Sequence, residues 1–268
     1  PDIIVRNIPV NRPDKEFGQY SGTLNNVLLS DNVEHGNPNV LYVRVFNQSP
    51  ILAYQSTVDI YWSRGSTLVM PKYWTQIGSI DIPVIPMNDM TMVYGPLVWN
   101  NVPEPGHYCF VGIIHNPFSP APDLSKISSI NSFWNFMSQN NNVVWRNFNV
   151  VDNIPNVNNE YNSYRFIARK PIYDIKERTR LEICCELPER AKAWLTGSIF
   201  NGKKRLDGNS CTLIPEFEHE NMISEESELM INYFIPKNSI PGEYSIYARQ
   251  LFDGNEVGRY TLHIKANL

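Results

Sequence analysis

Short runs of alternating apolar and polar residues recur along the chain, and this period of two constrains the fold more than any other feature. The clearest run is NVLYVRVFN (39–47), in which Leu41, Val43 and Val45 share one face of an extended strand. Side chains of a strand point alternately to its two faces, so such a run indicates a strand with one buried face. Clusters of Pro, Gly and Asn, which favour turns, separate the runs. The pattern predicts an all-β chain of antiparallel strands.

The predicted strands fall into two groups on either side of a stretch that lacks periodicity. That stretch, VDNIPNVNNEYNS (151–163), has the Asn- and Pro-rich composition of a linker and is the expected site of first proteolytic cleavage. We therefore predict two domains, residues 1–155 and 156–268. The strands expected in the first domain are 2–7, 39–47, 56–63, 75–84, 91–99, 107–114 and 142–152. Those expected in the second are 164–170, 179–187, 192–200, 211–217, 227–236, 242–252 and 256–265, with Asp-Gly hairpin turns at 252–256 and 206–210.

One segment of the first half has helical spacing instead. LSKISSINSFWNFMSQ (124–139) places Ile127, Ile130, Trp134 and Met137 three or four residues apart. This spacing puts them on one face of an amphipathic helix. We predict a short helix over 124–139, inserted in the first domain.

The sequence Pro-Gly-x-Tyr occurs once in each half, as PGHY (105–108) and PGEY (241–244), at the entry to the next-to-last predicted strand. In immunoglobulin-like sandwiches a Tyr near the start of that strand bonds through its hydroxyl to nearby backbone. Tyr108 and Tyr244 are placed for this structural role. The chain is therefore expected to form two tandem immunoglobulin-like antiparallel β-sandwich domains.

A series of motifs in the first half resembles a known family. The series is NPNVLYVRVFNQSP (37–50), STVDIYWSRGSTLVMPKYWTQIGS (56–79), VYGPLVWNNVPEPGHYCFVGIIHNP (93–117) and NNNVVWRNFNVVD (140–152). It is similar to the immunoglobulin-like modules of the bacterial cell-adhesion-related (CARDB-like) type, which accompany secreted bacterial proteins, although Val144 stands where that family often has Ala. The resemblance covers about residues 37–152 and implies a non-catalytic module without a cofactor. The second half resembles only a generic immunoglobulin-like sandwich.

Charge and hydropathy exclude some classes of partner. The formal net charge is −4 and no run of Lys and Arg stands out, so a groove for nucleic acid has no support. No apolar run is long enough to span a membrane. Because the chain begins at Pro1, we expect a processed piece of a larger protein, located outside the cell or at its surface.

Among catalytic motifs, none of the common hydrolase, zinc-peptidase or nucleotide-binding patterns occurs. His107 and Cys109 share one face of the apolar strand 107–114, with Val111 and Ile113 after them. This context favours a core thiol at Cys109 over a nucleophile. A peptidase acting through Cys109 and His107 remains the enzymatic alternative.

Three other cysteines lie in the second half. Cys185 continues the apolar face of Leu181 and Ile183, whereas the adjacent Cys184 points to the opposite face. Only one of the two can therefore bridge easily to Cys211. We favour free structural thiols over a Cys184–Cys211 bridge, with vicinal redox chemistry as a third option.

An acidic stretch, PEFEHENMISEESE (215–228), contains the oxygen ligands that calcium prefers. It lacks the regular spacing of a calcium loop, so a solvated loop is the favoured interpretation. The weak metal candidates in it are Glu216, Glu218, His219 and Glu220.

Aromatic residues are abundant, with 14 Tyr, 12 Phe and 6 Trp, and most are expected to pack in the core. Four lie off the main alternation: Tyr73, Trp74, Phe133 and Trp134. Together they could form an exposed platform for a sugar ring or a partner protein. A helix that simply covers the sandwich accounts for Trp134 equally well.

We therefore predict a non-catalytic binding, adhesion or structural module of a larger secreted or assembled bacterial system. Its expected partner is another protein or domain of the same assembly, or a glycan. The alternatives are a carbohydrate-binding module of an enzyme and a subunit or cargo of a toxin-like assembly. A row of exposed aromatic side chains on one sheet face would favour the first alternative. A long uncovered edge strand or a large apolar patch would favour the second.

Overall fold

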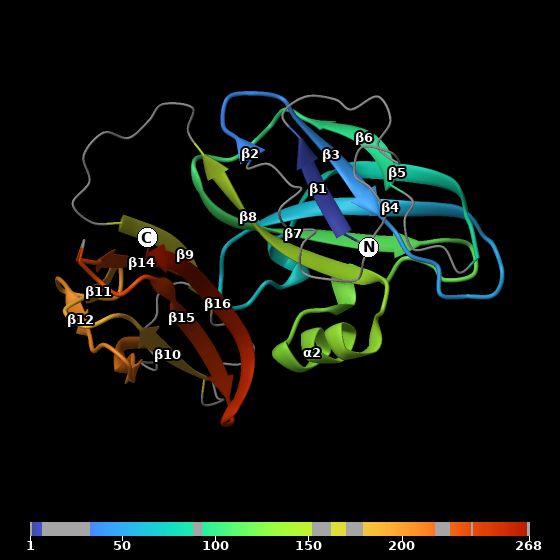
Figure 1. Ribbon diagram of the computed structural model, residues 1–268. Coiled ribbons are helices and arrows are strands. Elements are labelled where there is room, and N and C mark those ends of the chain that lie inside the picture. The colour runs from blue at the N-terminus through green and yellow to red at the C-terminus, as the bar shows by residue number, and fades with distance from the viewer. Residues whose placement is uncertain are drawn as a thin grey trace. The chain divides into compact units, whose positions relative to one another are not determined.

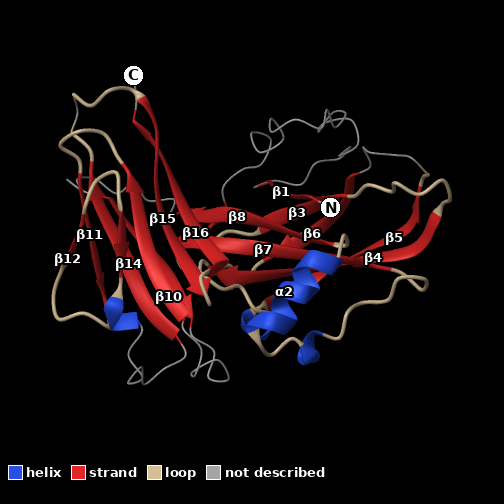
Figure 2. Ribbon diagram, turned by 90° about the horizontal axis from the view of Figure 1, so that it is seen from below, coloured by secondary structure: helices blue, strands red, loops and turns tan. Residues whose placement is uncertain are grey.

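The computed structural model describes residues 2–6, 33–87, 93–151, 162–169, 179–217, 226–236 and 238–266. Across these residues the chain forms four sheets, two in each of two compact units (Figures 1 and 2). All strand pairs but one are antiparallel in the described pairings, so the all-β prediction is confirmed.

Unit 1 contains a sheet of three strands and a sheet of five. The first sheet has the order β1 (Asp2–Arg6), β3 (Asn39–Arg44) and β6 (Val93–Trp99). The second has the order β2 (Val33–Glu34), β8 (Val143–Val151), β7 (Gly106–His115), β4 (Ala53–Arg64) and β5 (Thr75–Ile85). The short strand β2 runs parallel to β8.

Unit 2 contains two sheets of four strands. One has the order β13 (Cys211–Leu213), β10 (Thr179–Glu186), β15 (Gly242–Phe252) and β16 (Asn255–Ala266). The other has the order β12 (Lys204–Leu206), β11 (Lys192–Gly197), β14 (Glu226–Phe234) and β9 (Asn162–Arg169). The described residues also form the α-helix α2 (Ile130–Gln139) and three short 3-10 helices: η2 (Pro71–Tyr73), η3 (Leu124–Lys126) and η5 (Pro215–Phe217).

The strand order in both units is that of an immunoglobulin sandwich. In that fold strands B and E pair in one sheet, while strands C, F and G lie side by side in the other. In unit 1, β3 pairs with β6, and β4, β7 and β8 are neighbours. In unit 2, β9 pairs with β14, and β10, β15 and β16 are neighbours. The prediction of immunoglobulin-like sandwiches is therefore confirmed.

Each sandwich buries the apolar positions of its alternating strands between its two sheets. In unit 1, Leu41 and Val43 of β3 pack into the same core as Val58 and Ile60 of β4 and Phe110 of β7. The core of unit 2 is formed in the same way by the group Phe166, Leu181, Ile183, Leu195, Ile231 and Ile246. All of these side chains are at most 1% exposed. Burial of such faces is the main stabilising term of a sandwich.

The units do not divide the chain into two continuous halves. Unit 1 comprises Pro1–Ser63, Pro71–Lys126 and Phe136–Pro155. Unit 2 comprises Asn156–Leu268 together with two segments from the first half, Arg64–Met70 and Ile127–Asn135. The split into residues 1–155 and 156–268 stays a prediction, and it does not include these two upstream segments in the second domain, because a change in composition along the chain marks linkers and not distant contacts.

Of the two predicted Asp-Gly hairpin turns, one is present. Asp253 and Gly254 both have left-handed φ angles, of 47° and 83°, and join β15 to β16. The turn predicted at 206–210 is wrong, because it joins β12 to β13, which lie in different sheets.

The helix predicted over 124–139 is shorter than expected. The structure has the 3-10 helix η3 and, separately, the α-helix α2 (Ile130–Gln139). Ser129 sets the start of α2, because its hydroxyl accepts a bond from the backbone N–H of Ser132 at 3.1 Å. Asn140 lies just beyond its end and donates to the carbonyl oxygen of Phe136.

Both predicted tyrosine corners have the expected bond. The hydroxyl of Tyr108 donates to the carbonyl oxygen of Glu104 at 2.7 Å. The hydroxyl of Tyr244 donates to the carbonyl oxygen of Ile240, also at 2.7 Å and also four residues upstream. The two Pro-Gly-x-Tyr sequences therefore form the same local structure at the same strand of each sandwich.

The Gly of each motif is explained by the ring and not by its φ angle. Neither Gly106 nor Gly242 is among the described residues with positive φ. A Cβ at Gly106 would lie 3.3 Å from the ring of Tyr108, and one at Gly242 would lie 3.6 Å from that of Tyr244. A small residue lets the ring fold back over its own strand entry, most tightly at Gly106.

We predict that Tyr108→Phe lowers the free energy of unfolding by about 1–2 kcal/mol, because the Glu104 carbonyl loses its donor at a partly buried position. Tyr244→Phe should cost at most about 1 kcal/mol, since water can replace the hydroxyl at this more exposed corner. Urea denaturation, monitored by hydrogen exchange of peptides from each unit, measures the change in the free energy of unfolding for both variants. Tyr54→Phe, at an exposed ring, is the control and should change little. Two Phe variants as stable as the parent would contradict the role of both corners.

Candidate binding surface

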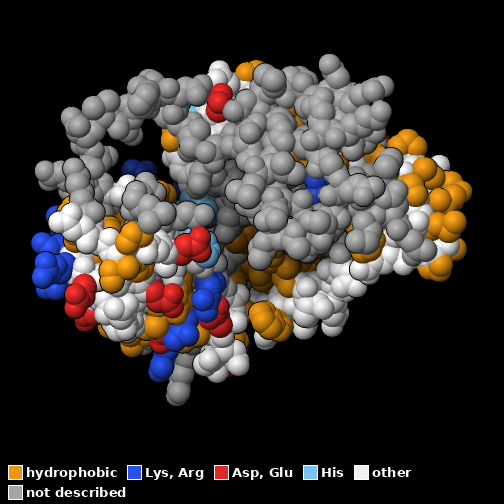
Figure 3. Space-filling view, in the orientation of Figure 1, with side chains coloured by type: hydrophobic (Ala, Val, Ile, Leu, Met, Phe, Trp, Pro, Cys, Tyr) orange, Lys and Arg blue, Asp and Glu red, His pale blue; other side chains and the backbone are white. Residues whose placement is uncertain are grey.

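One end of unit 1 exposes a group of large hydrophobic side chains. They lie in the connection between β3 and β4, in the first residues of β4 and at the end of β5. The exposed fractions are 43% for Phe46, 70% for Ile51, 39% for Leu52, 51% for Tyr54, 36% for Val84 and 55% for Met87. We call this group the hairpin-end patch. Figure 3 shows hydrophobic side chains gathered at the end of unit 1 where the connection between β3 and β4 lies.

A local break in strand alternation exposes part of this patch. Tyr54 pairs with Val84 across β4 and β5, two positions before the pair of Ser56 and Ile82. Side chains two positions apart share a face in a regular strand, yet Ser56 and Ile82 are buried and Tyr54 and Val84 are exposed. Between them Gln55 has a left-handed φ of 51°, which interrupts the alternation. The cross-strand pair of Tyr54 and Val84 is thereby turned outward.

Asn47 ties the connection to the end of β5. Its Nδ2 donates to the carbonyl oxygens of Ile51, at 2.8 Å, and Ile85, at 3.2 Å. Its Oδ1 accepts from the backbone N–H of Ser49 at 3.0 Å. These bonds hold Ile51 beside the end of β5.

The strand β5 lies at the edge of its sheet, where among the described strands it pairs only with β4. Side chains of β6 nevertheless lie against this edge. A Cβ at Gly78 would lie 2.9 Å from Leu97, and the hydroxyl of Tyr94 donates to the carbonyl oxygen of Val84 at 3.0 Å. A partner strand could not pair along β5 without displacing them. The hairpin-end patch is therefore the better docking surface of the two.

The four residues of the predicted aromatic platform do not share an exposed surface. Phe133 is only 5% exposed, so its ring belongs to the interior and that part of the prediction is wrong. The half-buried ring of Trp74 packs against Tyr61, at a centroid distance of 5.6 Å, and against Phe136, at 6.4 Å. Tyr73 is half-buried, and Trp134 is 54% exposed.

Other exposed aromatic side chains are scattered over the described part of the chain. Each lies on a different element or connection: Phe46 after β3, Tyr54 on β4, Phe118 after β7, Trp134 on α2, Trp145 on β8 and Phe234 on β14. A row of aromatic rings on one sheet face, which would favour sugar binding, is absent from the described residues.

The His107–Cys109 pair of the enzymatic alternative lies on β7. Cys109 is not part of a disulfide and is buried, with 8% exposure. Val111 and Ile113, which follow on the same face, are also buried. This surrounding matches the core thiol expected from the sequence and offers a substrate no access to the sulfur.

The acidic stretch is only partly within the described residues. Glu218, His219 and Glu220 lie outside them. Glu216 accepts a bond from Nζ of Lys204 at 2.7 Å, and Glu226 lies 3.0 Å from Nε of Arg169. The described carboxylates of this stretch therefore pair with cations of the protein.

Cys184 and Cys211 form a disulfide, so the preference for free thiols at these two positions was wrong. The two residues are direct cross-strand partners of β10 and β13. Their side chains therefore meet on one face of the sheet, which the sequence could not show because the two are 27 residues apart. Cys185 points to the core, as expected, and burial together with the nearby Asp207 carboxylate raises its pKa to about 12.

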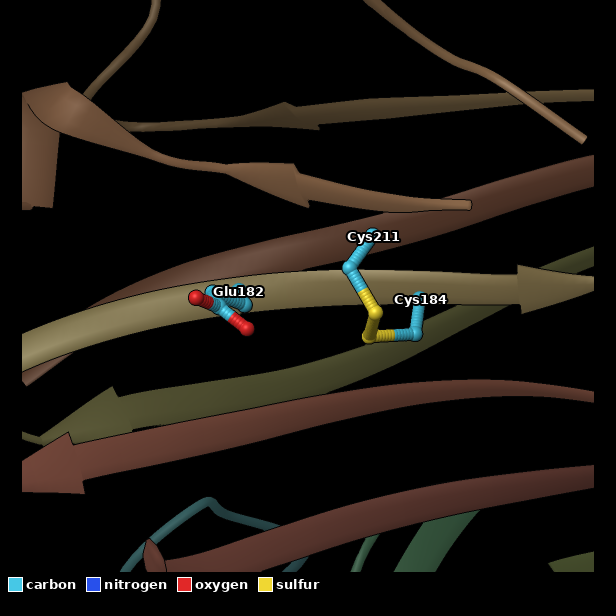
Figure 4. A group of neighbouring side chains, drawn as sticks. All are labelled: Glu182, Cys184 and Cys211. Carbon is cyan, nitrogen blue, oxygen red and sulfur yellow. A yellow bond between two sulfur atoms is a disulfide. The ribbon is translucent and has the colours of Figure 1, made fainter. Parts of the chain in front are cut away.

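Glu182 lies beside this disulfide, and the three side chains have ligand atoms within 4.8 Å of one another (Figure 4). The sulfur atoms of Cys184 and Cys211 are bonded to each other, so neither is available as the thiolate that a metal ion would need. Arg249 also forms an ion pair with the Glu182 carboxylate, with Nη2 at 2.6 Å from Oε2. In the oxidised chain this group is an ion pair beside a disulfide and not a metal centre.

A polar network on β4, β5 and β7 was not found from the sequence. Asp59 accepts from the hydroxyl of Ser79 at 2.6 Å, and its other oxygen lies 3.0 Å from Nε2 of His115. Burial, and then the Asp59 carboxylate, raises the pKa of Tyr61. In a hydrolytic triad the His lies between Ser and Asp, whereas here the Asp lies between Ser and His. The network therefore lacks the His next to the hydroxyl that a triad needs, and it ties three strands together instead.

Comparisons with known proteins add little beyond the fold. No family model matches the chain, and no curated protein matches it significantly. Red sea bream transglutaminase is similar at 9% identity and a TM-score of 0.25, over 88% of this chain and only 30% of that chain. The CupB6 tip adhesin from Pseudomonas aeruginosa is similar at 9% identity and a TM-score of 0.23, over 85% and 90%. Collagen adhesin from S. aureus is similar at 9% identity and a TM-score of 0.21, over 87% and 89%. The immunoglobulin-like assignment rests on the strand order of each unit.

Within the described residues, no helix is both long and apolar enough to cross a membrane.

We predict that iodoacetamide at about pH 8 labels neither Cys109 nor Cys185 in the native chain. Both thiols are buried, and the raised pKa of Cys185 leaves roughly one thiolate in ten thousand at that pH. Unfolding without reductant should expose these two to labelling, and reductant should add Cys184 and Cys211. Mass spectrometry of the labelled peptides is the measurement. Labelling of Cys184 or Cys211 without reductant would contradict the disulfide, and rapid native labelling of Cys109 with loss of an activity would revive the enzymatic alternative.

Proposed function

We propose that the chain is a non-catalytic protein-binding module of a larger secreted or cell-surface assembly, and that a partner protein docks on the hairpin-end patch. The observation that carries the proposal is the patch itself. Single exposed hydrophobic residues are common on protein surfaces, but six gathered at one end of a sandwich are unusual and mark interaction sites.

The chemistry of the patch favours a protein over a glycan as the partner. Sugar sites need aromatic rings flanked by hydrogen-bonding groups, whereas Ile51, Leu52, Val84 and Met87 offer only aliphatic or thioether contacts. Met adapts to varied partners, and Tyr54 and Phe46 can serve as large anchors. The loops at the end of an immunoglobulin-like sandwich are also a common place for binding surfaces in this fold.

The finer family assignment is part of the same proposal. The motifs that resemble CARDB-like modules coincide with residues that build the fold of unit 1. Asn39, for example, is fully buried and bonds to backbone atoms of Glu34 and Asn37, and Trp62 packs edge-on against Tyr108 at 5.5 Å. We infer that unit 1 is a module of this type, in which these residues are structural and the loops differ to suit the partner.

An extracellular location also belongs to the proposal. The Cys184–Cys211 disulfide supports it, because disulfides persist mainly in oxidising compartments. The described cysteines lie in the disulfide or in the core, which supports a role without catalysis.

We predict that a photo-crosslinking residue, benzoylphenylalanine, placed at Tyr54 captures one discrete protein from the surface and secreted fractions of the source cells. The same residue at Phe234, an exposed ring of unit 2, is the matched control and should not capture it. Ile51→Asp combined with Val84→Lys should lower capture by about tenfold or more, as expected when anchors of an interface are replaced by charges.

Equal capture at Tyr54 and Phe234, or capture unchanged by the charged variant, would contradict the proposed surface. No capture together with binding on a glycan array would favour the carbohydrate-binding alternative.

A further inference from the structure

The second sandwich includes a segment that lies far upstream in the sequence. Arg64–Met70, which connects β4 to η2, belongs to unit 2. Ser66 forms a parallel bridge to Ile167 of β9. The N–H of Thr67 donates to the carbonyl oxygen of Ile167 at 3.0 Å, and the N–H of Ile167 donates to that of Gly65 at 2.8 Å. The segment thus pairs with the edge strand β9 as a short additional strand, in the way that peptides add to sheet edges.

The buried guanidinium of Arg169 forms hydrogen bonds with this segment. The side chain of Arg169, at the end of β9, is 3% exposed. Its Nε donates to Glu226 at 3.0 Å, and its Nη1 donates to the Ser66 hydroxyl at 2.7 Å and to the Leu68 carbonyl at 3.0 Å. Removing the segment would leave a buried cation without two acceptors, which is costly.

A second buried polar residue of unit 2 depends on the same segment. Gln250 of β15 is 0% exposed. Its Oε1 accepts from the hydroxyl of Thr67 at 2.6 Å, and its Nε2 donates to the carbonyl oxygen of Arg169 at 2.7 Å. The two hydroxyls of Ser66 and Thr67 are therefore each bonded to a buried side chain of the second sandwich.

The backbone of β16 lies very close to the backbone of the segment at Gly258. The β15–β16 pairing shifts register just after Gln250, which lies opposite Gly258. A Cβ at Gly258 would collide with the carbonyl oxygen of Thr67. Glycine beside a bulge is a usual way to let another backbone come near.

We propose that β9, β15 and β16 form a binding site for an extended peptide with two adjacent hydroxyl side chains, and that Arg64–Met70 is its resident ligand. The segment acts as an internal donor strand that completes the second sandwich. This site lies in unit 2 and is separate from the hairpin-end patch. One consequence is that the linker is not needed to hold the N-terminal piece of the chain to the second sandwich.

The test uses the full chain with a specific protease site placed within residues 152–161 and cut after folding. The two pieces should co-elute in size-exclusion chromatography. Thr67→Val removes one hydroxyl at constant shape and should speed dissociation of the nicked pieces by about tenfold, the factor that corresponds to about 1.4 kcal/mol. Gly258→Ala, which adds the colliding Cβ, should speed it at least as much.

Two matched variants control for general damage. Thr57→Val removes a hydroxyl that bonds the exposed Asp81, and Gly208→Ala adds a Cβ that meets no atom within 4 Å. Neither should change the dissociation rate. An excess of the synthetic peptide SRGSTLVMPK (63–72) should displace the N-terminal piece, and the same peptide with Ala and Val in place of Ser66 and Thr67 should not.

Pieces of the parent chain that separate at once after cutting would overturn the proposal. So would dissociation that Thr67→Val and Gly258→Ala leave unchanged, or equal displacement by the two peptides. If Gly258→Ala does not fold, Thr67→Val and the peptide pair decide the outcome by themselves.

Discussion

The burial of one apolar sheet face against another is the interaction on which both units depend. A strand that alternates apolar and polar residues has one face that must leave water, and a second sheet provides the cover. Leu41, Val58 and Phe110 meet in this way in unit 1, as do Leu181, Leu195 and Ile246 in unit 2. The tyrosine corners fix the entry to one strand of each sandwich.

The features with functional interest are found where this arrangement is broken. At Gln55 the alternation of β4 is interrupted, and the apolar pair of Tyr54 and Val84 turns to solvent. On the second sandwich, the buried side chains of Arg169 on β9 and Gln250 on β15 bond to groups of a segment from the first half. The first break is the surface that we propose for another protein, and the second is the site that we propose for the chain's own segment.

Much of the fold could be predicted from the sequence because it depends on local patterns. Period-two alternation located most strands to within a few residues, and the repeated Pro-Gly-x-Tyr identified Tyr108 and Tyr244 and their bonds. Features that depend on register or on distant pairing could not be predicted. The Cys184–Cys211 disulfide requires knowing that β10 lies beside β13, and the turn at 206–210 requires knowing that β12 and β13 lie in different sheets. The left-handed φ of Gln55 and the placement of Ser66 and Thr67 in unit 2 have no local signal at all.

We propose that the two sandwiches are defined by pairing in space and not by the two halves of the sequence. Native-state hydrogen exchange of the parent chain, resolved to single amides, tests this proposal. The N–H of Thr67 bonds to Ile167 and should therefore exchange with the same opening free energy as the amides of β9 and β15 in unit 2. If Thr67 exchanged instead with the amides of β4 and β5, or as fast as an unprotected loop, the second sandwich would not include this segment and the claim would be wrong.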